Sequence, residues 1–155
     1  MTSTVGSATL TVTLTEAITL NGYDQGSTNT LTIASVNEVS KRIVTATTTE
    51  QEVLAFGTAV AAGTFLEDKV VYFRITNLDD TNHVVLTFKS EGNHEFAVKL
   101  DKGQAFIYNG DLAGGVVDTM DASASALSLA LEDLVNVTAD AETASCDLEI
   151  LVACI

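Results

Sequence analysis

The sequence contains no proline and no tryptophan, and only two of its 155 residues are cysteines. Aromatic residues make up 6% of the chain, which weighs against a carbohydrate-binding platform, because sugars commonly stack on aromatic rings. A disordered chain would contain fewer apolar residues than the 46% found here and more proline, lysine and glutamate. We therefore expect the chain to fold.

Basic residues are also scarce. Seven lysines and arginines face 21 acidic residues, which gives a formal net charge of −14, and all seven lie between Lys41 and Lys102. Because lysine and arginine supply most of the affinity for phosphate groups, we expect neither nucleic acid nor an anionic membrane surface as a partner. Such a charge most simply confers solubility, and docking of an acidic face onto a basic partner is the alternative.

No apolar run approaches the length that spans a membrane, and residues 1–7 lack the basic start of a signal peptide. Cys146 and Cys154 are eight residues apart in one expected strand. They would share a face at a separation of about 26 Å, which is too far for a disulfide between them. We therefore expect buried, reduced thiols in a chain made in a reducing cytosol.

Strict alternation of apolar and polar residues marks residues 70–108. The pattern runs through 70–76, 83–89 and 95–100. Successive side chains of a strand leave opposite faces of a sheet, so the alternation predicts half-buried strands. The residues predicted to be buried together are Val71, Phe73, Ile75, Val84, Leu86, Phe88, Phe96, Val98, Leu148, Ile150 and Val152.

Further strand patterns lie on both sides of this block. They cover residues 8–15, 30–34, 42–48 and 52–56, with a polar loop at 25–29, and a C-terminal hairpin joins 134–139 to 146–155. About ten short strands with at most one short helix predict an all-β chain, an antiparallel, jelly-roll-like β-sandwich forming a single domain over residues 1–155.

Residues 110–131 are interpreted as an irregular insertion within this domain. Leucine positions in 121–135 fit both helical and strand spacing, and we favour a short helix or an irregular segment there.

Residues able to carry chemistry are few and scattered. His83 and His94 belong to no local motif, and we expect both to be solvent-exposed. Residues 79–82 place oxygen ligands close together but lack the length and terminal glutamate of an EF-hand, which predicts an Asx turn. The threonines of residues 9–15 would suit an ice-binding array, but we expect an ordinary solvent face, because the spacing is not evident in neighbouring segments. We assign no catalytic, cofactor-binding or metal-binding residue, and expect neither a cofactor nor an enzyme.

Two pieces of the sequence are similar to a known group of proteins. The run Tyr72-Phe73-Arg74-Ile75-Thr76-Asn77-Leu78-Asp79 ends a strand on Arg-x-x-Asn-Leu-Asp, and Lys99-Leu100 begins a Lys-Leu-x-x-Gly-x-Ala step. Residues 138–152 lead from Ala-Asp-x-x-Thr-Ala into an apolar last strand. Together these features resemble the small β-rich virion proteins of tailed bacteriophages.

The resemblance implies a virion structural protein, most simply a capsid decoration (cement) protein that binds the outer shell as a symmetric oligomer, with a trimer favoured. Its partners would be copies of itself and the major capsid protein. We expect residues 56–65 and 112–131, which combine small and apolar side chains, to supply the contacts. A receptor- or carbohydrate-binding β-sandwich of a phage fibre or adhesin is the alternative. The insertion at 110–131, and Lys102 where a proline is common, depart from the pattern and leave capsid, neck and tail locations open.

Overall fold

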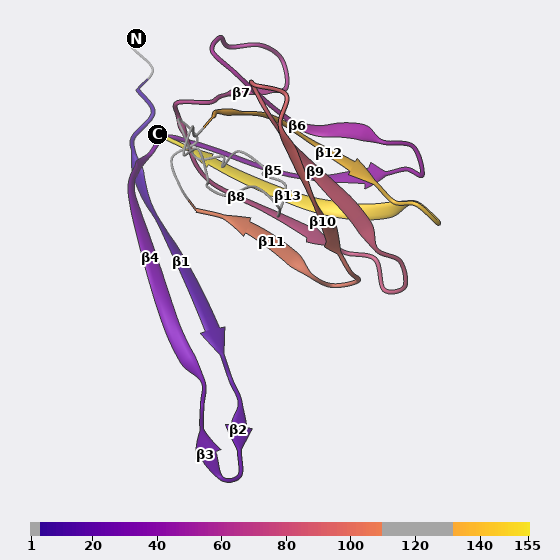
Figure 1. Cartoon of the computed structure of the whole chain (residues 1–155). Coiled ribbons are helices and arrows are strands. Elements are labelled where there is room, and N and C mark those ends of the chain that lie inside the picture. Colours follow the sequence, from indigo (N-terminus) through magenta and orange to yellow (C-terminus); the bar gives the residue numbers. More distant parts are fainter. Residues whose placement is uncertain (1–3, 110–131) are drawn as a thin grey trace, which may run out of the picture. The chain divides into compact units, whose positions relative to one another are not determined.

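The computed structural model of the chain describes residues 4–109 and 132–155 (Figure 1). Thirteen strands and no helix lie within this part of the chain. Contacts divide the chain into two compact units, residues 1–38 together with Ile155, and residues 39–154. That the two units form a single domain over residues 1–155 stays a prediction.

The second unit is a β-sandwich. One sheet has the strand order β11-β8-β13-β5 and the other β10-β9-β12-β6-β7. The strands are β5 (Glu38–Ala46), β6 (Gln51–Gly57), β7 (Thr64–Leu66), β8 (Val70–Asn77), β9 (Val84–Ser90), β10 (Glu95–Leu100), β11 (Ala105–Tyr108), β12 (Leu134–Asp140) and β13 (Cys146–Cys154). Without β7, which pairs in parallel with β6, this is the eight-stranded order of a jelly roll, as predicted.

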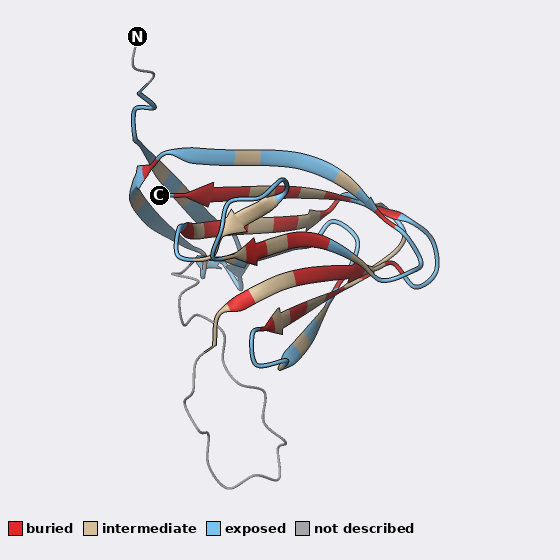
Figure 2. Ribbon diagram, turned by 90° about the horizontal axis from the view of Figure 1, so that it is seen from above, coloured by how far each residue is buried: buried red, intermediate tan, exposed pale blue. Residues whose placement is uncertain are grey.

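Both sheets contribute alternate residues to one core (Figure 2). Phe73 lies at its centre, with the rings of Phe56, Phe88, Phe106 and Tyr108 at centroid distances of 5.0 to 6.4 Å. The predicted core positions that are buried are Phe73, Ile75, Val84, Leu86, Phe88, Leu148, Ile150 and Val152.

Three predicted core positions are only half-buried. Phe96 and Val98 lie on β10, which is an edge of its sheet, so fewer neighbours cover them. Val71 lies opposite a register shift in β13, between Ala153 and Cys154. That irregularity puts Val70 in the core instead of Val71.

The prediction that β12 and β13 form a C-terminal hairpin is wrong. β12 lies between β9 and β6, whereas β13 lies between β8 and β5 in the other sheet. Each strand therefore already has a partner on both edges, and the link between them crosses the sandwich. Leu134 and Val135, which the helical spacing included, are the first residues of β12. The predicted insertion at 110–131, and the rest of the possible helix up to residue 131, lie outside the described residues.

The first unit is a long β-hairpin. β1 (Ala8–Glu16) pairs antiparallel with β4 (Ser27–Val36), and β2 (Thr19–Leu20) pairs with β3 (Tyr23–Asp24). Positive φ angles at Asn21 and Gly22, 52° and 83°, fit the tight turn that this dipeptide predicts. β4 begins at Ser27, so the predicted loop at 25–29 is partly strand.

Candidate functional site

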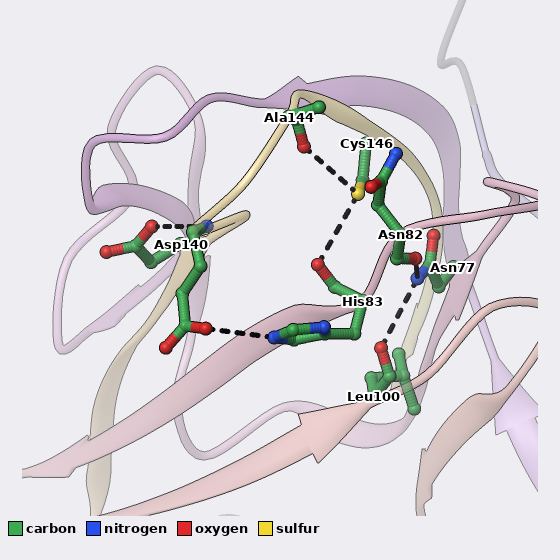
Figure 3. Close-up of polar contacts among 8 residues, drawn as sticks. Asn77, Asn82, His83, Leu100, Asp140, Ala144 and Cys146 are labelled. Carbon is green, nitrogen blue, oxygen red and sulfur yellow. Dashed lines mark hydrogen bonds and ion pairs between the residues drawn. The ribbon is translucent and has the colours of Figure 1, made fainter.

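His83 lies at one end of the sandwich, directly before β9 (Figure 3). Its Nε2 is 3.0 Å from Oε2 of Glu142 in the link between β12 and β13. The Glu142 amide donates to Asp140 Oδ1 at 2.9 Å, which fixes the turn that carries this carboxylate. The His83 side chain is only 26% exposed, so the expected solvent-exposed histidine is instead a half-buried partner of a carboxylate.

Cys146 lies in the same corner, but its thiol faces the backbone. Sγ is 3.5 Å from the carbonyl oxygens of His83 and Ala144 (Figure 3). Burial raises the pKa of the thiol, and the negative charges of Asp79 and Asp147 raise it further. A catalytic cysteine needs the opposite environment, with a positive neighbour and a lowered pKa. Both cysteines are buried and neither forms a disulfide within the described residues, as the sequence predicts.

Asn77 connects three parts of the chain from a fully buried position. Its Nδ2 donates to the carbonyl oxygens of Asn82 at 2.9 Å and Leu100 at 3.3 Å, and its Oδ1 accepts from the Asp79 amide at 3.0 Å. Asp79 Oδ1 then accepts from the amides of Asn82 and Thr81, at 2.6 and 2.8 Å. The predicted Asx turn is therefore confirmed. Hydrogen bonds from these two amides, Asn82 first, lower the pKa of Asp79.

His94 belongs to a second corner, in the turn between β9 and β10. Glu132 Oε2 lies 2.5 Å from Ser90 Oγ and 2.7 Å from His94 Nδ1. A carboxylate thus lies between the serine and the histidine, whereas in a catalytic triad the imidazole lies between the serine and the carboxylate. His94 is also less exposed than expected, at 39% of its side chain. No sequence pattern pointed to Glu132, which lies 38 residues from its histidine.

In the part of the chain that the structure describes, no three histidine, cysteine, aspartate or glutamate side chains are arranged to hold a metal ion. Within the same residues there is no helix with the length and apolar character needed to cross a membrane.

The N-terminal hairpin has two chemically different faces. Leu10 pairs with Ile33 and Val12 with Leu31, and Leu14 extends the same face. The opposite face carries three threonine pairs, Thr11 with Thr32, Thr13 with Thr30 and Thr15 with Thr28. The expectation that the threonine spacing is not repeated on a neighbouring strand is therefore wrong. Two-stranded ribbons are strongly twisted, however, so these pairs do not form a flat array.

The hairpin's apolar face is poorly covered. No residue of β1, β2 or β3 is buried, and in β4 only Val36 is (Figure 2). Leu14 is 50% exposed and Leu31 36%.

The predicted contact segment at 56–65 also exposes an apolar side chain. Phe56 is buried, whereas Val60, between β6 and β7, is 83% exposed. The other predicted segment, 112–131, is outside the described residues.

Comparison with known proteins gives little guidance. No family model matches the chain, and no curated protein sequence does. A solved structure of Bacillus endospore appendages, described as disulfide-linked pili, matches 99% of this chain and 95% of its own at 10% identity, with a TM-score of 0.41. Pseudomonas aeruginosa AlgX matches 71% of this chain over 25% of its own length at 13% identity, with a TM-score of 0.40. Neither is a phage protein, and likenesses this weak carry no argument about function.

Proposed function

We propose that the protein is a structural subunit of a phage virion, a capsid decoration protein that binds the outer shell as a symmetric oligomer. The observation that carries this proposal is the N-terminal hairpin. An isolated two-stranded hairpin is marginally stable in water, and a third strand or a packed face is normally required. Within the described residues, Leu14 and Leu31 are exposed on the apolar face. A contact with another subunit would cover them.

Charge favours a second copy of the chain as the partner of this face. Residues 1–38 contain three acidic residues and no basic one. By the strand alternation, only Glu16 lies on the face with Leu10, Val12 and Leu14, at its end, where it accepts a hydrogen bond from Ser27 at 2.6 Å. Such faces from the copies of a symmetric oligomer can therefore meet around an apolar centre with charges at the rim, as in protein interfaces generally.

The sandwich supplies a second exposed apolar element for contact with the shell. Val60 lies in the small-residue segment between β6 and β7, at the edge of the five-stranded sheet. An edge segment of this kind can dock without disturbing the core. In this proposal the hairpin holds copies of the chain together, and the Val60 segment faces the major capsid protein.

Mass spectrometry of purified virions tests the proposal. The protein should be present in many copies per particle, and extraction under mild denaturation should release it while the shell remains. Its absence from particles, or a presence restricted to a few copies at the tail, would contradict a decoration role. A few copies at a fibre would instead support a receptor-binding protein.

A further inference from the structure

Glu132 lies in a cradle formed by the turn between β9 and β10. Its Oε2 accepts hydrogen bonds from Ser90 Oγ at 2.5 Å and His94 Nδ1 at 2.7 Å. The Glu132 side chain is 19% exposed and Ser90 is 3% exposed, so the bond to Ser90 is the better shielded from water, whereas the His94 side chain is 39% exposed. Hydrogen bonds to an ionised oxygen are stronger than those between neutral groups.

The turn is shaped to receive this carboxylate. A Cβ atom at residue 92 would clash with the carboxyl group of Glu132, so Gly92 leaves the room that the carboxylate occupies. The Ser90 hydroxyl also accepts from the His94 amide at 3.1 Å, and Asn93 takes a positive φ of 63°. The hydroxyl therefore couples the backbone of the turn to the carboxylate.

The same turn is joined to the chain on the other side of Glu132. The Glu91 amide donates to the Asp133 carbonyl oxygen at 3.0 Å, and Leu134 pairs with Ser90. Glu132 thus anchors the residues that lead into β12 to the turn that ends β9. Its side chain lies where the described chain resumes after residue 109.

Protonation should weaken this anchor. The hydrogen bond from His94, followed by that from Ser90, lowers the pKa of Glu132 below its usual range. A carboxylate whose folded pKa is depressed stabilises the fold above its unfolded pKa, and that contribution is lost as the pH falls through the folded pKa.

The surrounding acidic groups act in the opposite direction. Burial raises the pKa of Glu67, and the negative charges of Asp133, Glu91 and Asp68 raise it further. Protonating Glu67 therefore relieves repulsion in this corner. We assign the effect of acid on the turn to Glu132, because its carboxylate bonds directly to both Ser90 and His94.

We propose that Ser90, Glu132 and His94 form an acid-sensitive latch, which holds the β9–β10 turn against the start of β12 while Glu132 is ionised and releases it when Glu132 is protonated. The latch acts on this end of the sandwich, and the core strands β8 and β13 stay paired when it opens.

Hydrogen exchange of the full chain, followed by mass spectrometry, tests the latch. Glu132→Gln removes the charge and keeps the shape of the side chain. Gly92→Ala displaces the carboxylate without straining the backbone, because the φ angle of Gly92 is not positive. Glu91→Gln is the control, because it makes the same change at an exposed acid of the same turn. Peptides covering 90–94 report the latch, and peptides from β13 report global unfolding.

In the parent chain, exchange of the turn, corrected for intrinsic rates, should rise between about pH 5 and pH 3 while β13 stays protected. Glu132→Gln and Gly92→Ala should each exchange about tenfold faster in the turn at pH 7, and Glu132→Gln should lose the acid step. Glu91→Gln should match the parent. Parent-like protection in Glu132→Gln at pH 7, or an unchanged acid step, would overturn the proposal. If Glu132→Gln also speeds exchange in β13, that variant unfolds globally and Gly92→Ala decides. Parent-like protection of the turn in Gly92→Ala would then overturn the proposal.

Discussion

At the scale of single residues, the polar side chains that looked available for chemistry are instead used to hold loops in place. Asn77 is the clearest case, because its amide joins the loop of residues 78–83, at Asp79 and Asn82, to the backbone of Leu100. His83 and His94 each pair with a glutamate that the chain brings from far away, 59 and 38 residues along. The Arg-x-x-Asn-Leu-Asp strand end is therefore explained by packing and turn formation.

Replacing Asn77 by alanine should lower the free energy of unfolding by about 2–4 kcal/mol, because buried backbone groups lose their partners. Asn82→Ala is the matched control. The side-chain amide of Asn82 donates to Asp79 at 3.3 Å in a partly exposed site, so its loss should cost less than about 1 kcal/mol. Urea unfolding of both variants measures the difference. Equal costs would show that Asn77 does not connect these loops.

At the scale of elements, the hairpin of residues 8–36 is the part whose sequence and surroundings disagree. Its alternation is that of a strand pair with one buried side, yet the described chain buries neither side fully. The sandwich strands, in contrast, bury the face that their pattern predicts. The simplest physical resolution is a cover from another molecule.

A contact through the apolar face of the hairpin can be tested at Leu31 and Thr32, which are neighbours on opposite faces of β4. Both are exposed, so a glutamate at either position should leave the fold of one chain intact. Leu31→Glu would place a charge in the apolar contact and should weaken self-association about tenfold or more, whereas Thr32→Glu should leave it nearly unchanged. Sedimentation velocity over a concentration series measures both. Equal effects would place the contact elsewhere.

The sequence predicted the strands, the sandwich and most of the core, because period-two alternation reports directly which face is buried. It did not predict which sheet β12 and β13 join, because strands in either sheet carry the same pattern. It placed Val71 inside because the register shift opposite Val71 leaves no mark in the local sequence. The pairing of Thr11 with Thr32 and the cradle around Glu132 depend on partners distant in the sequence, which one-strand patterns do not report.

At the scale of the whole molecule, charge opposes the assembly that the hairpin favours. Each copy carries a formal charge of −14, so copies repel one another at long range. Salt screens this repulsion, with a Debye length of about 8 Å at physiological ionic strength and about 3 Å at 1 M. An apolar contact is not weakened in the same way. Association through the hairpin should therefore strengthen as salt is added.

The mass of the purified full chain in solution, measured by light scattering at low and at high salt, tests the central claim most directly. One chain has a mass of 16.2 kDa. We expect a discrete multiple of that mass, about threefold for the trimer, with a larger assembled fraction at high salt. A mass of one chain at every protein and salt concentration would contradict the account of this protein as a self-associating structural subunit.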